Sequence, residues 1–238
     1  MKKTFNVRML VTCAVMSAIG VVLAFFIHFP IIPAVPFLEY DPADILIFVS
    51  TYAFGIPVGL AMTVVVALVQ GLTVSAGSGF TGILMHIIST GGYVLAAGLV
   101  YRATDALRRS KAGKTGPEIV SLSLSTAAGM AATVGLMTLW NILLTPVFMG
   151  IERDFLIKNF LGLIVLFNLI KISINGVASA VFAVPFRKLA EKFPGERSIL
   201  YEGKGGGGKS RYVETAFGLA VILVELLVIG IIAFTVAG

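Results

Sequence analysis

Long apolar runs constrain this chain more than any other feature of its sequence. Six runs are long enough to cross the roughly 30 Å hydrocarbon core of a bilayer as helices; they cover residues 9–29, 58–75, 82–101, 120–145, 160–186 and 215–237. A further run, residues 43–57, would span only about 22 Å as a helix, so we expect it to pack inside the bundle. The sequence therefore predicts an all-α integral membrane protein.

The composition excludes the soluble classes of protein. Of the 238 residues, 58% are hydrophobic and 13% are charged, whereas soluble domains carry about 25% charged residues. A disulfide scaffold is excluded as well, because the single cysteine, Cys13, has no partner in the chain. The net charge of +6 has to be interpreted from where the basic residues lie.

The basic residues lie almost entirely on one side of the predicted bundle. With the N-terminus inside, three precede residue 9, five lie between residues 102 and 114, and seven lie between residues 187 and 211, against two on the outside, Arg153 and Lys158. Because basic loops stay in the cytoplasm, we expect a multi-pass protein of the cell membrane with a cytoplasmic N-terminus and an outer C-terminus. The positive charge then needs no nucleic-acid partner.

The segment between the first two runs cannot be helical. Residues 30–42 hold four of the nine prolines, Pro30, Pro33, Pro36 and Pro42, and are otherwise mostly apolar. A stiff apolar outer loop is typical of a lid over a binding site. A loop that only packs over the bundle is the alternative.

A polar stripe marks the run at 160–186. Asn168, Lys171 and Asn175 fall within an arc of about 60° on a helix. A lysine at mid-membrane costs about 2.5–3.5 kcal/mol on insertion scales and usually faces a cavity or a partner. The stripe therefore predicts a polar site inside the bundle.

Asn141 lies near the outer end of the run at 120–145, at a depth that can match Asn168. The two amides predict either an outward-opening polar pocket or a hydrogen bond between two helices. Gln70 and His86 have no spaced polar partners, so we interpret each as a helix–helix contact.

No catalytic or metal-ligating constellation is present in the sequence, which argues against an enzyme and against a bound metal. Residues 203–210 match the phosphate-loop pattern, but they follow no strand and open no soluble α/β unit. We interpret them as a flexible Gly-rich linker.

Several strings together resemble the riboflavin-specific substrate-binding (S) component of energy-coupling factor (ECF) vitamin transporters. They are FLEYDPADI, the following FGIPVGL, Asn141 ahead of a proline, and NLIKISIN, and the resemblance covers roughly residues 5–190. It implies a six-helix protein that binds riboflavin, without a cofactor, under a gating outer loop. It also implies docking on a transmembrane coupling subunit and two cytoplasmic ATPases.

The resemblance implies specific residues and boundaries. An Ala-x-x-x-Ala face, matched by Ala14 and Ala18, would contact the coupling subunit. The riboflavin contacts would be Asn141, Asn168, Lys171, Leu38, Tyr40 and Asp41. Residues 1–190 would form the substrate-binding domain, 191–214 a charged and Gly-rich cytoplasmic linker, and 215–238 a seventh transmembrane helix without a counterpart in the six-helix family.

Three other functions stay open at this point. The chain could be a secondary transporter in which Lys171 or Glu225 carries a coupling proton, although no inverted repeat is recognisable. It could be an S component for another vitamin. It could also be a flavin-related membrane scaffold that docks through its last helix.

Overall fold

The computed structural model describes residues 7–110 and 118–192. Its helices are α1 (Val7–Phe26), α2 (Ala43–Phe54), α3 (Ile56–Leu72), the 3-10 turn η1 (Ala76–Ser78), α4 (Gly79–Ser110), α5 (Glu118–Met149), α6 (Arg153–Asn159) and α7 (Leu161–Lys192). Two short strands, β1 (Phe29–Pro30) and β2 (Glu39–Tyr40), lie between α1 and α2. The predicted linker, the run at 215–237 and Glu225 lie outside the described residues.

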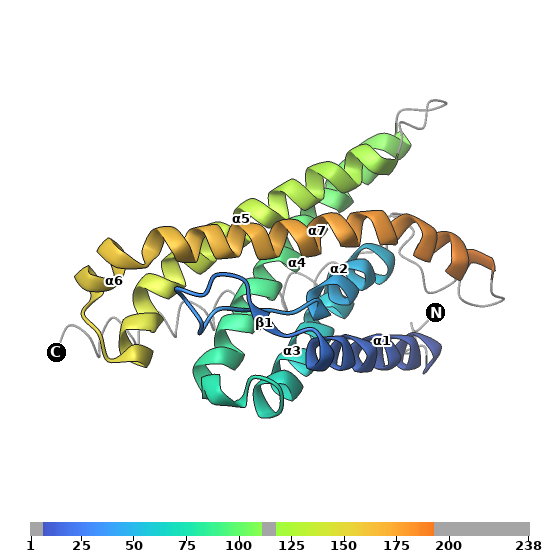
Figure 1. Cartoon of the computed structure of the whole chain (residues 1–238). Helices are drawn as coiled ribbons and strands as arrows, with labels where there is room; N and C mark the ends of the chain where they lie inside the picture. Colours follow the sequence, from blue (N-terminus) through green and yellow to red (C-terminus); the bar gives the residue numbers. More distant parts are fainter. Residues whose placement is uncertain (1–6, 111–117, 193–238) are drawn as a thin grey trace.

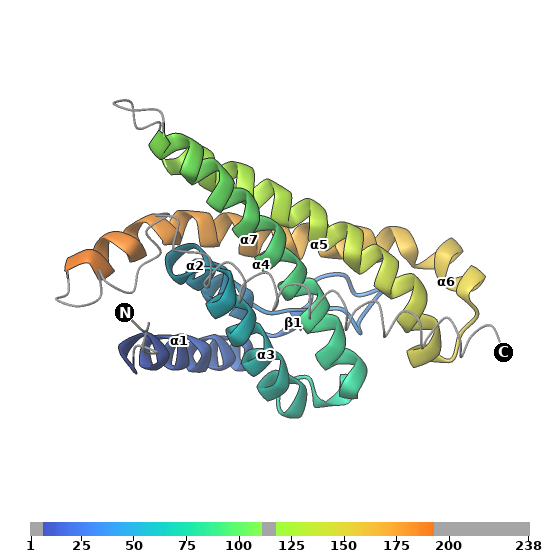
Figure 2. The same cartoon turned by 180° about the vertical axis from the view of Figure 1, so that it is seen from behind.

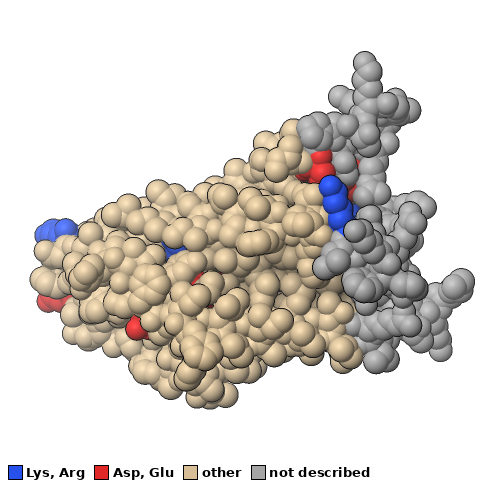
Figure 3. All heavy atoms as spheres, turned by 45° about the vertical axis from the view of Figure 1, so that its right-hand side comes forward, with Lys and Arg blue, Asp and Glu red and all other residues tan. Residues whose placement is uncertain are grey.

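The predicted fold class is confirmed. Four of the described helices are long and apolar enough to cross a membrane, in the segments Met9–Phe26, Ala76–Leu107, Glu118–Met149 and Leu161–Lys188. In the view of Figure 3, charged side chains gather toward the two ends of the molecule, and only isolated ones lie on the broad surface between these ends. The chain is therefore a multi-pass membrane protein.

Helix α2 forms the centre of the bundle, as its short apolar run predicts. Ten of its twelve residues are buried, and it packs against α1, α3, α4 and α7. The chain turns directly from α2 into α3 at Gly55, whose φ of 98° lies in a region that side-chain-bearing residues rarely adopt. The two short helices pack against each other, and the start of α2 and the end of α3 lie at the same end of the bundle, as the contact between Gln70 and Asp41 shows.

Aromatic packing joins α2 to α4 and α5. The rings of Phe48 and Tyr93 stack with centroids 3.6 Å apart, and the Tyr52 hydroxyl lies 3.1 Å from both the Tyr93 hydroxyl and Thr126 Oγ1. These hydroxyls bond one another where water is excluded, so they do not carry the cost of unpaired buried polar groups.

The loop between α1 and α2 folds back over the bundle. Its strands pair antiparallel, with Phe29 opposite Tyr40 and Pro30 opposite Glu39, and their rings at Phe29 and Tyr40 lie 5.6 Å apart. In both views the loop lies between α7 and the pair α3 and α4 (Figures 1 and 2). The prolines exclude helix here as predicted, whereas the two-residue pairing was not predicted.

Two further differences from the sequence-based prediction concern helix ends. The segment between α5 and α7 contains a short helix, α6, for which the apolar runs gave no prediction. Helices α4, α5 and α7 each have 32 residues and extend beyond their apolar runs, because apolarity marks the membrane-buried part of a helix and not its polar ends.

The close approach of α4 and α5 generates a prediction about Gly129. A Cβ at Gly129 would lie 2.7 Å from the ring of Tyr93 and 3.0 Å from Ala97 Cβ, whereas a Cβ at Gly135, on the same helix, would meet nothing within 4 Å. We expect Gly129→Val to lower the free energy of unfolding by about 1–3 kcal/mol and Gly135→Val to leave it nearly unchanged. Thermal unfolding in detergent measures both, and equal shifts for the two variants would contradict this packing.

Candidate functional site

A cavity lies beneath the loop, between α3, α4 and α7. Its lining combines apolar side chains with a dense group of polar and charged ones. The lining residues include His28, Phe37, Leu38, Glu39, Asp41, Asp44, Gln70, Ser75, His86, Thr90, Met137, Phe167, Asn168 and Lys171. Its volume is about 140 Å³, close to that of a cavity that holds a benzene ring and below the roughly 300–1,000 Å³ of pockets for drug-sized ligands. The loop lies over a small polar cavity that is partly open to the outside of the molecule.

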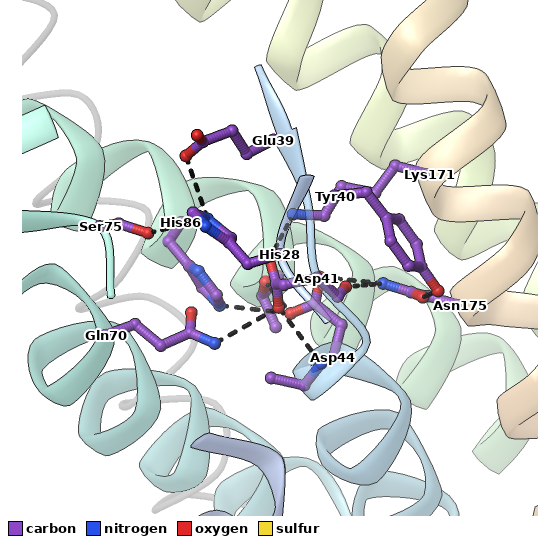
Figure 4. Close-up of polar contacts among 12 residues, drawn as sticks. His28, Glu39, Tyr40, Asp41, Asp44, Gln70, Ser75, His86, Lys171 and Asn175 are labelled. Carbon is purple, nitrogen blue, oxygen red and sulfur yellow. Dashed lines mark hydrogen bonds and ion pairs between the residues drawn. The ribbon is translucent and has the colours of Figure 1, made fainter. Parts of the chain in front are cut away.

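Asp41 is the centre of this polar group. Lys171 Nζ lies 2.8 Å from Asp41 Oδ2, while Gln70 Nε2 donates to Oδ1 at 3.3 Å and the backbone N–H of Ala43 donates to the same oxygen at 3.2 Å. Figure 4 shows these groups converging from the loop, α3 and α7. The ion pair explains how a lysine is tolerated on an otherwise apolar helix, because the loop supplies an acid 2.8 Å from its ammonium.

Asn175 holds the backbone of the loop one turn further along α7. Its Nδ2 donates to the carbonyl oxygen of Asp41 at 3.0 Å, and its Oδ1 accepts a hydrogen bond from the Tyr40 hydroxyl at 3.0 Å. Two residues of the predicted stripe, Lys171 and Asn175, therefore bind the loop to α7. The stripe serves the loop as well as the cavity.

A second buried carboxylate, Asp44 at the start of α2, lies beside the first. It accepts a hydrogen bond from Thr90 Oγ1 at 2.7 Å, and Asn175 Nδ2 lies 3.5 Å from its other oxygen. His86 Nε2 is 3.2 Å from Asp44 Oδ1, but it is not aligned for a hydrogen bond and has no other partner.

Gln70 and His86 differ from their interpretation as isolated helix–helix contacts. Both line the cavity and approach the two aspartates. Sequence reasoning missed this because each is a single polar residue on its own helix, and only the fold brings them together. The run of acids at Glu39, Asp41 and Asp44, which had no cations near it in the sequence, was the available signal.

The mouth of the cavity carries a third acid. His28 Nε2 lies 3.0 Å from Glu39 Oε2 and 3.4 Å from Ser75 Oγ. These contacts join the base of the loop to the connection between α3 and α4.

Asp41 lies in the loop, outside the spanning helices, and its charge is stabilised by its neighbours. Burial by itself acts to raise the pKa of this carboxyl, but the Lys171 ammonium and then His86 outweigh that effect. The pKa of Asp41 therefore lies below its ordinary value, and the ion pair is present at neutral pH.

The residues expected from the resemblance occupy different positions around the cavity. Leu38, Asp41, Asn168 and Lys171 line it. Tyr40 is buried beside it, bonded to Asn175.

Asn141 is fully buried and is not among the lining residues. Its Nδ2 donates to Met137 O at 2.7 Å, and its Oδ1 accepts from Thr145 Oγ1 at 2.9 Å. Asn168 likewise donates to a carbonyl of its own helix, Ile164 O, at 2.8 Å. In this state each amide is satisfied within its own helix and not by the other amide.

Ala14 and Ala18 lie on α1 and are both exposed. The face around them is apolar and also exposed, as Val11, Val15 and Ile19 show. Neither alanine lines the cavity. Within residues 7–110 and 118–192, no group of three or more His, Cys, Asp or Glu side chains is arranged to hold a metal ion.

Comparison with known proteins adds to this geometry. The sequence model of the family described as "ECF transporter, substrate-specific component" matches residues 8–237, a range that includes the run at 215–237. The solved structure of the S component of a bacterial ECF transporter shares 25% identity at a TM-score of 0.55, and the match covers 77% of this chain and 96% of that chain. A comparison with curated proteins gives no significant match.

The Asp41–Lys171 pair generates a stability prediction. Lys171→Met leaves the Asp41 carboxylate buried without its cation, so we expect the ligand-free protein to lose about 3–5 kcal/mol of unfolding free energy. The double variant Asp41→Asn with Lys171→Met should regain part of this loss, because no uncompensated charge remains. Lys158→Met, at a lysine on α6 that is exposed, serves as the control and should change little.

Thermal unfolding in detergent measures these proteins together with the single variant Asp41→Asn. Losses that simply add in the double variant would contradict a coupled ion pair.

Proposed function

We propose that this chain, which belongs to the family of substrate-specific components of ECF transporters, binds riboflavin in the cavity beneath its loop and presents it for uptake. The family membership makes the chain a substrate-binding membrane transport protein and not an enzyme. It also implies that the chain works with a membrane coupling subunit and ATPases.

The observation that carries the proposal is the mixed chemistry of the cavity wall. Asn168 and Lys171 lie on one face of α7, where an amide and an ammonium can bond the pyrimidine rim of an isoalloxazine ring, which alternates acceptors with one N–H donor. Phe37, Leu38 and Phe167 supply apolar surface for the dimethylbenzene end.

The remaining polar groups suit the sugar-alcohol chain of riboflavin. Asp41, Gln70 and Thr90 offer carboxylate, amide and hydroxyl oxygens to a row of hydroxyl groups. Tyr40 and Asn141 lie just outside the present cavity wall, and we propose that they reach the ligand once the cavity has enlarged.

We propose that the loop moves when riboflavin binds. The cavity volume of about 140 Å³ suffices for one small ring and not for a tricyclic ring system with a ribityl chain. The loop is attached to α7 by Lys171 and Asn175, so the ligand must displace or lengthen these contacts. We propose the loop as the gate of the site.

The orientation follows from the same groups of residues. The cavity is lined by the loop and by the connection between α3 and α4, both of which the distribution of basic residues places outside. We propose an outward-facing site, a cytoplasmic N-terminus, and α1 as the surface that meets the coupling subunit.

A binding titration tests the substrate. The purified full-length chain in detergent should bind riboflavin, and co-purified flavin should colour it yellow. Asn168→Leu should weaken binding by about 1–3 kcal/mol, the cost of leaving a buried polar partner unsatisfied. Asn159→Leu is the matched control, because Asn159 bonds its own helix in the same way but is exposed.

If another vitamin binds to the protein and riboflavin does not, the assignment of riboflavin as the substrate is wrong. Equal effects of the two asparagine variants would overturn the assignment of Asn168.

An uptake assay tests the coupling surface. Ala14→Trp should leave riboflavin binding intact and abolish ATP-dependent uptake, because close helix approach tolerates only small side chains. Ala131→Trp, at an exposed alanine of α5, should not affect uptake. Loss of binding in Ala14→Trp would show that this face is needed within the chain.

The same assay separates an ATP-driven component from a secondary transporter. Vesicles that contain the chain alone should not accumulate riboflavin with or without a proton gradient, and accumulation driven by the gradient would contradict the proposal.

A further inference from the structure

We propose that Asp44 sets the charge selectivity of the cavity, so that the site accepts uncharged or cationic ligands and rejects anionic ones such as a phosphate ester. This inference rests on the proposed function for its choice of flavin probes. It concerns a residue that the resemblance does not assign, and it specifies the class of substrate.

The buried charges around the cavity do not cancel. Two carboxylates, Asp41 and Asp44, are both buried, and a single ammonium, Lys171, bonds Asp41 at 2.8 Å. Among the Asp, Glu, Lys and Arg side chains that line the cavity, the buried ones carry one excess negative charge, and Glu39 at the mouth adds a second.

Neutral donors satisfy Asp44 without neutralising it. Thr90 donates through a hydroxyl at 2.7 Å, and Asn175 approaches through an amide at 3.5 Å. His86 is near the carboxylate at 3.2 Å but forms no aligned hydrogen bond. The carboxylate is therefore held in place by neutral donors, beside the Asp41–Lys171 pair (Figure 4).

The burial of Asp44 makes this charge effective. The residue is only 2% exposed, and like charges separated by a few ångströms in a medium of low dielectric constant repel strongly. Asp44 lines the cavity, so an anionic ligand group placed beside it would be repelled. Rejection by a built-in repulsive element is a common route to specificity.

The test compares two ligands that differ only in one phosphate. The purified full-length chain in detergent is titrated at pH 8 with riboflavin and with riboflavin 5′-phosphate, because the phosphate group is close to doubly charged at that pH. We expect the wild-type protein to prefer riboflavin by at least tenfold. Asp44→Asn should reduce the ratio of the two affinities at least threefold, chiefly because the phosphate ester binds more tightly to this variant.

Two further variants serve as a control for net charge and as a second test of the charge rule. Asp154→Asn makes the same change in net charge at an exposed residue of α6 and should leave the ratio unchanged. His86→Lys keeps Asp44 and adds a fixed positive charge beside it, so it should narrow the ratio even if Asp44→Asn does not fold. If Asp44 has only a structural role, Asp44→Asn should weaken the binding of both ligands equally. The proposal is wrong if neither Asp44→Asn nor His86→Lys changes the ratio of the two affinities.

Failure of the flavin assignment can be distinguished from failure of the charge rule. If the wild-type protein binds neither flavin, the proposed substrate is wrong, and thermal shifts with pyridoxine, thiamine, biotin and pantothenate then test the charge rule alone. Stabilisation by the uncharged or the cationic vitamin supports the rule. Stabilisation by biotin or pantothenate, which both carry a carboxylate, contradicts the rule. So does the absence of stabilisation by any of the four vitamins.

Discussion

The ion pair between Asp41 and Lys171 is the interaction on which the rest of the site depends. Lys171 lies about ten residues into α7, roughly 15 Å along the helix, where an unpaired ammonium would be costly. The acid that compensates it comes from the loop, 130 residues away in sequence. Asp41 and Lys171 therefore compensate each other's charge, and their pairing holds the loop over the bundle.

This pairing links three functions to one set of residues. The contacts of α7 with Asp41 and Tyr40 attach the loop, close the cavity and place the cation beside two carboxylates. A ligand that enters has to replace contacts of similar polarity, so its own polar groups decide how easily the loop is released. The docking face proposed on α1 is separate, because Ala14 and Ala18 do not line the cavity.

Much of this architecture could be predicted from the sequence, because a bilayer leaves few choices for an apolar chain. The lengths of the runs fix the spanning helices, the short run at 43–57 fixes a buried α2, and the prolines exclude helix from the loop. The periodicity of Asn168, Lys171 and Asn175 also placed these residues on one helix face, of which Asn168 and Lys171 line the cavity. What could not be predicted was pairing over long sequence distance: Asp41 with Lys171, Gln70 with Asp41, and His86 with Asp44. Helix periodicity places a side chain on a face, but only the packed fold determines which loop meets that face.

The movement of the loop is the most direct consequence of a cavity smaller than the ligand. Spin labels at Ala34 on the loop and Gly77 between α3 and α4, both exposed, can be introduced in a Cys13→Ser background, and the distance between them can be measured by pulsed electron paramagnetic resonance. We expect the distances between the two labels to be short and narrowly distributed in the empty protein, and to become longer when riboflavin is bound. An unchanged distribution in protein saturated with riboflavin would contradict this expectation.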